Sequence, residues 1–294
     1  MSRTDKSYGN IDKIILTLQE RPLGIHTFKA FKLMREGIFL GGLLTNSESW
    51  INITKKDILS LEKPDNILQK KALSVLGNPS KAFTMLELGI VPIRFILMKK
   101  RILFLLYILK ENKESMIYQV FEALNNESRK GDFVHLTNQD RKDLDITLLN
   151  SEIEGLSYLM WKNIINKKIK IAALSYLSEE NSKKEKTKNI IFSELKISEY
   201  LFKNVNTSLS KIIFGLRSRT FDVKEYNPWR YNDDLCVKCQ EFKETMDHFV
   251  QCNSYGDKLK VDWKLIYGNN MEEQVFIGTF VKRRYKMRQD ILQQ

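Results

Sequence analysis

The chain has little of several residue types that would direct it to other structural classes. Its 294 residues include only three cysteines, five prolines and 13 glycines. So little proline and glycine argues against a disordered chain, a β-sandwich or a β-barrel. The strongest apolar run covers residues 102–109, whereas a membrane-spanning helix needs about 20 residues. No apolar leader follows Met1. We therefore expect no signal peptide, no membrane partner and a nuclear or cytoplasmic location.

The chain carries an excess of positive charge. Lysine and arginine outnumber aspartate and glutamate by 48 to 36, which gives a formal net charge of +12. Such a surface attracts polyanions, and RNA or DNA is the natural partner of a basic protein. Charge alone predicts only non-specific attraction, so the kind of partner has to come from motifs.

Hydrophobic residues recur at helical spacing along nearly the whole chain, as in Ile11, Ile14, Ile15 and Leu18. Thr54 and Asp57 resemble a capping box that opens a helix, and Pro64 predicts a bend or break within it. We predict an all-α protein, with strands confined to a short hairpin around Cys236 and Cys239. Helices are expected at residues 11–18, 28–44, 54–76, 93–109, 115–124, 139–149, 151–166, 167–178, 190–204 and 207–217 and in the tail, with a linker at 125–138 and a charged loop at 179–189.

All three cysteines lie within one ligand-spaced cluster. Cys236, Cys239, His248 and Cys252 form the pattern C-x2-C-x8-H-x3-C. Thiolate and imidazole are the ligands that zinc prefers, and His248 and Cys252 would share one face of a helix. Four protein ligands leave no open coordination position, so we predict a structural zinc ion. The alternative is three unrelated buried cysteines.

The segment around these ligands is too small to fold without help. A structural zinc ion contributes about 10–16 kcal/mol in such modules, enough to fold it. Phe242, Phe249 and Trp229 are the candidates for a miniature core beside the metal.

Two blocks carry a resemblance to a known family. One is FLGGLLTNSESW at 39–50, followed by LELGIVP at 86–92, and the other is FGLRSR at 214–219, followed by the cysteine–histidine motif. In this order they resemble the C-terminal part of a non-LTR (LINE-type) retrotransposon reverse transcriptase. The resemblance implies that the first block leads from the polymerase palm into a helical thumb.

The resemblance also implies a division of the chain into three regions. Residues 1–130 would be a thumb-like helical bundle, residues 131–215 a helical linker, and residues 216–294 a zinc-stabilised module with a basic helical tail. The expected function is RNA or DNA binding by the non-catalytic C-terminal portion of an RNA-directed DNA polymerase. The expected partners are nucleic acid and the rest of such a polymerase.

No catalytic residue is predicted. A polymerase palm needs paired carboxylates that hold metal ions, and no aromatic-Ala-Asp-Asp block precedes residue 39. Tyr231-Asn-Asp-Asp234 matches Tyr-x-Asp-Asp only formally, because no apolar strands flank it. Asp257, Asp262 and Lys264 are spaced too closely for a restriction-like nuclease. We expect no activity from the chain alone, although the family it resembles is enzymatic.

Two alternatives to this reading stay open. The chain is a piece of an active reverse transcriptase whose palm is encoded upstream of residue 1, or it is a domesticated helical scaffold whose zinc module binds another protein. His26 and His135 have no ligand-type neighbours in sequence, so we expect ordinary histidines. Under the nucleic-acid hypothesis, the predicted phosphate contacts are Lys99, Lys100, Arg101, Arg217, Arg219, Arg230, Lys238, Lys282, Arg283, Arg284, Lys286 and Arg288.

Overall fold

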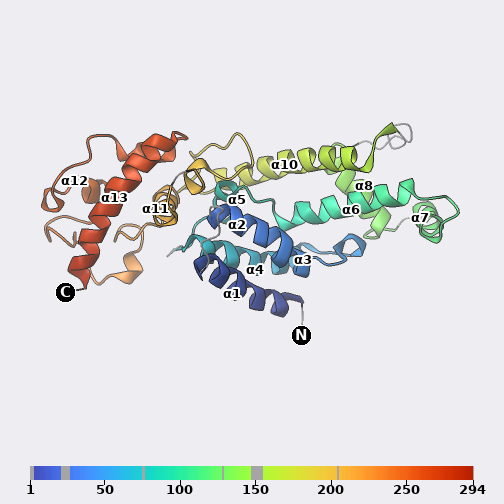
Figure 1. Ribbon diagram of the computed structural model, residues 1–294, viewed down its shortest axis with the longest axis horizontal. Coiled ribbons are helices and arrows are strands. Elements are labelled where there is room, and N and C mark those ends of the chain that lie inside the picture. Colours follow the sequence, from blue (N-terminus) through green and yellow to red (C-terminus); the bar gives the residue numbers. More distant parts are fainter. Residues whose placement is uncertain are drawn as a thin grey trace. The chain divides into compact units, whose positions relative to one another are not determined.

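The computed structural model describes residues 3–20, 27–74, 77–127, 129–146, 155–203 and 205–293 (Figure 1). Within these ranges helices predominate, and there is no strand, only an isolated antiparallel bridge between Leu235 and Lys243. The predicted all-α class is confirmed. The predicted hairpin is reduced to this one bridge. His26 and the start of the helix expected at 151–166 lie outside the described residues.

The chain forms two compact units, each assembled from separate stretches of sequence. Unit 1 comprises Met1–Thr17, Leu33–Ile67 and Ile90–Tyr176, and unit 2 comprises Leu18–Lys32, Leu68–Gly89 and Leu177–Gln294. These limits differ from the expected boundaries at residues 130 and 215, so the three-region division stays a prediction. The helices with residues in both units are α1 (Arg3–Glu20), α2 (Thr27–Met34), α4 (Lys55–Leu73) and α10 (Tyr158–Ser182).

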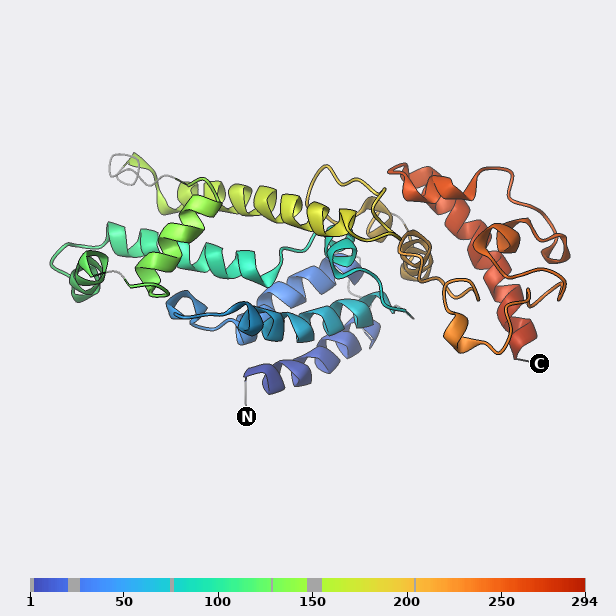
Figure 2. The same cartoon turned by 180° about the vertical axis from the view of Figure 1, so that it is seen from behind.

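Unit 1 is built around α6 (Ile93–Lys110), which runs beside α10 in both ribbon views (Figures 1 and 2). The rings of Phe95 and Tyr176 meet edge to face with centroids 5.7 Å apart. Leu105 and Ile108 pack with Phe133 in a hydrophobic cluster. The other elements of unit 1 are a π-helical turn η1 (Arg35–Phe39), α3 (Leu40–Leu43), the 3-10 turn η2 (Ser47–Ser49), α7 (Met116–Asn126) and α8 (Phe133–Asp143).

Several local features predicted for unit 1 are confirmed, and the expected effect of Pro64 is not. The helices expected at 93–109 and 115–124 are confirmed as α6 and α7. The capping box is confirmed too, because the Thr54 amide donates to Asp57 (2.9 Å) and the Asp57 amide donates to the Thr54 hydroxyl (3.2 Å). The helix that follows continues through Pro64 without a break.

Two expectations for the middle of the chain were wrong. Residues 133–138 are helical rather than linker, because Asp132 caps the His135 amide at 2.7 Å and Phe133 is buried. From Tyr158 on, the helices expected at 151–166 and 167–178 form the single helix α10, which also takes up the first residues of the expected charged loop. At 133–138, capping and burial outweighed the polar composition of the segment.

Unit 2 joins α5 (Lys81–Leu88) to the C-terminal part of the chain. Phe83 and Phe214 pack with ring centroids 5.8 Å apart. α11 and α13 come close at Gly278, where a Cβ atom would lie 2.6 Å from Cγ1 of Ile213. The remaining elements are η3 (Glu199–Leu201), α11 (Thr207–Arg217), η4 (Pro228–Arg230), α12 (Met246–Gln251), η5 (Asn253–Tyr255), η6 (Trp263–Tyr267) and α13 (Met271–Leu292).

The segment 190–204 is not the helix that its periodicity predicts. Over the described residues 190–203 only the short 3-10 turn η3 forms, because the backbone is used in contacts with the end of α5. The Ser198 amide donates to the Glu87 carbonyl at 2.8 Å. Gly89, with φ of +60°, approaches so closely that a Cβ atom would lie 2.4 Å from the carbonyl carbon of Lys196. Tertiary hydrogen bonding has replaced the helical pattern here.

Among the described residues, no helix is both long enough and apolar enough to cross a membrane.

Unit 1 contains a fully buried ion pair that yields a stability prediction. Nε and Nη2 of Arg35 donate to the two carboxylate oxygens of Asp65 at 2.7 and 2.6 Å, and both side chains are buried. Asp65→Ala leaves the guanidinium uncompensated and should cost about 3–5 kcal/mol of unfolding free energy. Urea denaturation measures this loss. Asp145→Asn removes the exposed charge that pairs with Lys168, keeps a residue suited to the positive φ at this position, and should leave the midpoint unchanged.

Candidate metal centre and basic surfaces

The four predicted ligands come together in unit 2. Cys236 Sγ, Cys239 Sγ, Cys252 Sγ and a ring nitrogen of His248 all lie within 4.8 Å of one another. Cys239 Sγ and His248 Nε2 are 3.4 Å apart. In a tetrahedral zinc site, ligand atoms about 2.1–2.3 Å from the ion are about 3.5–3.8 Å from each other. The cluster could therefore hold one metal ion, and its donor set is compatible with zinc.

The first ligand pair sits on a tight loop. The Cys236 amide donates to the Phe242 carbonyl at 2.7 Å, and the Gln240 amide donates to the Cys236 carbonyl at 2.9 Å. Gln240 adopts a positive φ of 60°, which closes the turn. The loop thus directs both sulfur atoms toward one point, as the C-x2-C spacing predicts.

The second ligand pair depends on α12. Thr245 caps this helix by accepting a hydrogen bond from the His248 amide at 3.0 Å. The Cys252 amide donates to the His248 carbonyl at 2.7 Å, which puts the two ligands one helical turn apart. The predicted one-turn relation between His248 and Cys252 is confirmed.

The two cysteines of the loop differ in their environment. Burial raises the pKa of the Cys236 thiol to about 12. For Cys239 burial acts in the same direction, but hydrogen bonds from the Glu241 and Phe242 amides prevail and lower the pKa of its thiol. A bound cation deprotonates coordinating thiols. At Cys236 a bound cation would act against the effect of burial on the thiol.

The aromatic core beside the cluster is only partly the predicted one. Phe249 is fully buried and packs with Tyr255 and Phe221 at centroid distances of 5.3 and 6.2 Å. Phe242 and Trp229 are 61% and 67% exposed, so their expected place in the core was wrong. The side chains that fill this space come from segments before and after the motif.

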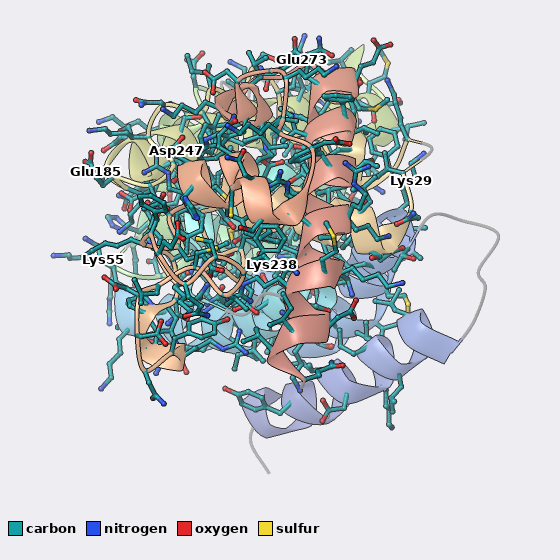
Figure 3. The ribbon with its side chains drawn as sticks, turned by 90° about the vertical axis from the view of Figure 1, so that its left-hand side faces the viewer. Lys29, Lys55, Glu185, Lys238, Asp247 and Glu273 are labelled. Atoms are coloured by element: carbon teal, nitrogen blue, oxygen red, sulfur yellow. The ribbon has the colours of Figure 1, made fainter. Side chains whose placement is uncertain are left out.

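The basic residues of α13 fall into two sets, one on the buried side of the helix and one on its outer side. α13 lies beside α12 and the ligand loop (Figures 1 and 3). Ile277, Val281, Arg284 and Arg288 follow one buried stripe of α13. Lys282, Arg283 and Lys286 lie on the opposite side of the helix, where Arg283 and Lys286 are exposed and Lys282 is half-buried, and we call these three residues the outer face of α13. The pattern was visible in the sequence, because positions 284 and 288 continue the apolar stripe of 277 and 281.

Four of the predicted phosphate contacts are inside the protein, which corrects the expectation for Arg101, Arg217, Arg284 and Arg288. Arg101 forms a buried ion pair with Asp140 at 2.7 Å. A buried guanidinium is tolerable only with such partners, so these groups do not face phosphates.

The other three buried arginines bind acceptors within unit 2. Arg217 donates to Glu87 at 2.7 Å and to the carbonyl groups of Ile266 and Gly268. Arg288 pairs with Glu244, and Arg284 donates to backbone carbonyl groups at the end of α12.

The other predicted contacts are more accessible. Lys238 is exposed on the ligand loop, where Figure 3 labels it. Arg230 is exposed but donates to Asp222 at 2.8 Å. Arg219 is half-buried, with its guanidinium over the Tyr267 ring at 5.6 Å. In unit 1, Lys100 donates to the Leu44 carbonyl at 2.5 Å and Lys99 is half-buried.

One basic surface was missed by the sequence analysis. Lys162 and Lys170 are exposed on α10, and their charges act on Lys99 of α6. Burial, together with these two ammonium groups, lowers the pKa of Lys99, although the Glu36 carboxylate acts in the opposite direction. We call Lys99, Lys162 and Lys170 the α6/α10 cluster. Nothing in the sequence links residues of two helices so far apart.

Comparisons with protein families, curated proteins and solved structures yielded no match to this chain.

The carboxylates that mimic catalytic motifs have ordinary partners. Asp233 accepts from Lys224 at 2.6 Å, and Asp234 pairs with Lys243 at 2.8 Å. Asp262 caps η6 by accepting from the Lys264 amide. These contacts account for the acidic residues of the loop without a reaction. His135 lies on α8 and is not among the residues of the described metal cluster.

The metal centre can be tested directly. We expect native mass spectrometry to find one zinc ion per chain, removed by a chelator and by acidification, since thiolates and imidazole must be deprotonated to bind. His248→Asn should abolish this binding, whereas His135→Asn is the matched control and should retain it. Retention of stoichiometric zinc by His248→Asn would contradict the assignment.

Proposed function

We propose that this chain binds RNA or DNA and that its cysteine–histidine cluster holds a structural zinc ion. Four protein donors and two buried thiols support a closed site rather than a catalytic one. In this proposal the ion organises the module, and the phosphate contacts come from lysine and arginine side chains elsewhere on its surface.

The observation that carries the proposal is the outer face of α13. Lys282 and Lys286 lie one turn apart, and neither forms an ion pair with any described residue. Arg283 has only a distant partner, with Nη2 3.9 Å from the Asp257 carboxylate. Phosphates of a nucleic-acid backbone would neutralise such a face and release counterions.

The α6/α10 cluster supports the same partner class from unit 1. The ammonium groups of Lys162 and Lys170 both oppose the charge of Lys99, where Glu36 is the compensating carboxylate, and an anionic ligand would relieve the remaining repulsion. We count the two basic surfaces as separate contacts.

We further propose that the chain is the non-catalytic C-terminal portion of a LINE-type reverse transcriptase. The support is the order of the blocks at 39–50, 86–92 and 214–219 and the cysteine–histidine motif that follows. The rest of that polymerase would be its protein partner. A piece of an active polymerase and a domesticated protein-binding scaffold remain the two alternative hypotheses.

Salt titration tests the phosphate contacts. Binding of labelled RNA or duplex, followed by fluorescence anisotropy, should weaken linearly in log K against log[salt]. Lys286→Ala and Arg283→Ala should each reduce that slope by about 1. Lys183→Ala is the control, because this exposed amine is already paired with Glu179 and Glu180. Unchanged slopes in both α13 variants would refute the outer face as the contact.

Primer extension separates this proposal from an active enzyme. The chain with template–primer, dNTPs and Mg²⁺ should give no extended product, since Asp233 and Asp234 are engaged by lysines rather than arranged to hold two metal ions. Extension of the primer would establish catalysis. Protein complexes that survive both nuclease and moderate salt would favour the scaffold hypothesis.

A further inference from the structure

Two buried arginines of α13, one helical turn apart, reach the two halves of the ligand set. Arg284 and Arg288 are both fully buried, unlike their neighbours on the outer face. Arg288 directs its guanidinium toward the loop that carries Cys236 and Cys239, and Arg284 directs its guanidinium toward the end of α12. α13, which carries the basic outer face, therefore contacts the segments of both ligand pairs.

Arg288 reaches the ligand loop through Glu244. Nε and Nη2 of Arg288 donate to the two carboxylate oxygens of Glu244, both at 2.9 Å, and both side chains are fully buried. The same carboxylate lies 3.5 Å from the amide of Val237, the residue after Cys236, and accepts from the Lys224 amide at 3.1 Å. Burial opposes the charge of Arg288, but Glu244 raises its pKa. Glu244 thus holds the base of the loop while it binds α13.

Arg284 reaches the other pair through the end of α12. Its Nη1 donates to the carbonyl groups of Phe249 at 2.7 Å and Cys252 at 3.1 Å, and its Nη2 donates to the Asp257 carbonyl. The last carbonyl groups of a helix have no partner within it, and a cation there is favoured by the helix dipole. One of these acceptors belongs to Cys252, which is itself a ligand.

We infer that Arg284 and Arg288 are positioning residues that couple occupancy of the metal site to the docking of α13. The inference rests on the proposed zinc site. An ion that fixes the loop and the end of α12 also fixes the acceptors that hold α13. Such coupling is reciprocal, so α13 in turn strengthens metal binding. The outer face of α13 then depends on the metal, although none of its cations is a ligand.

Hydrogen–deuterium exchange of the full chain with and without zinc tests this coupling. In the wild type, zinc should slow amide exchange across residues 277–290. In Arg284→Gln and Arg288→Gln, this zinc-dependent protection should shrink, and the Kd for zinc in a chelator competition should rise about 10–100-fold. Arg283→Gln and Lys286→Gln are matched controls on the same helix, and they should keep the wild-type zinc Kd and the wild-type zinc-dependent protection.

The design separates positioning from a general loss of stability. A merely structural role would destabilise the metal-free and zinc-bound forms alike and leave both the zinc Kd and the zinc-dependent protection unchanged, which would overturn the inference. If Arg288→Gln fails to fold, Glu244→Gln, which keeps the shape of the side chain, should show the same weakened zinc binding. Arg284→Lys, which keeps a cation at the helix end, should restore part of the affinity.

The outcomes also distinguish a failure of the coupling from a failure of the zinc assignment. No zinc bound by the wild type would overturn the metal assignment and the coupling together. Zinc bound by the wild type with no change in α13 exchange would overturn the coupling alone.

Discussion

A guanidinium group that leaves water must keep its hydrogen bonds, and this constraint governs both units of the protein. Arg35, Arg101, Arg217 and Arg288 are each buried against a carboxylate, and Arg284 is buried against carbonyl groups. Removing either partner strands a charge in a medium of low dielectric constant. The positions of these acceptors therefore restrict how the helices and loops of each unit can pack.

The same constraint limits which basic residues can contact a polyanion. A net charge of +12 suggests a broadly basic surface. Buried arginines do not contribute to it, so the surface available to a polyanion is narrower than the sequence suggests. Among the described residues, the basic groups proposed to meet a polyanion are the outer face of α13, the exposed lysine of the ligand loop and the α6/α10 cluster. Each is small, and each can be altered without disturbing a buried ion pair.

Buried arginines also hold the segments that carry the candidate metal ligands. The ligand loop and α12 present ligands inward, while their backbone amide and carbonyl groups and the Glu244 carboxylate contact α13. The candidate metal ligands and the contacts that hold α13 thus lie on the same short segments of chain.

The sequence by itself determined the features that depend on neighbours a few positions away. The all-α class, the capping box at Thr54 and the ligand set ending in Cys252 all follow from short spacings. The wrong expectations include the structure of residues 133–138 and 190–204, the division of α10 into two helices, the core positions of Phe242 and Trp229, and the buried arginines. Glu87 stands 130 positions before Arg217, and Glu244 stands 44 before Arg288. Only the tertiary structure could decide that these cations face inward, because burial depends on partners that local patterns do not reveal.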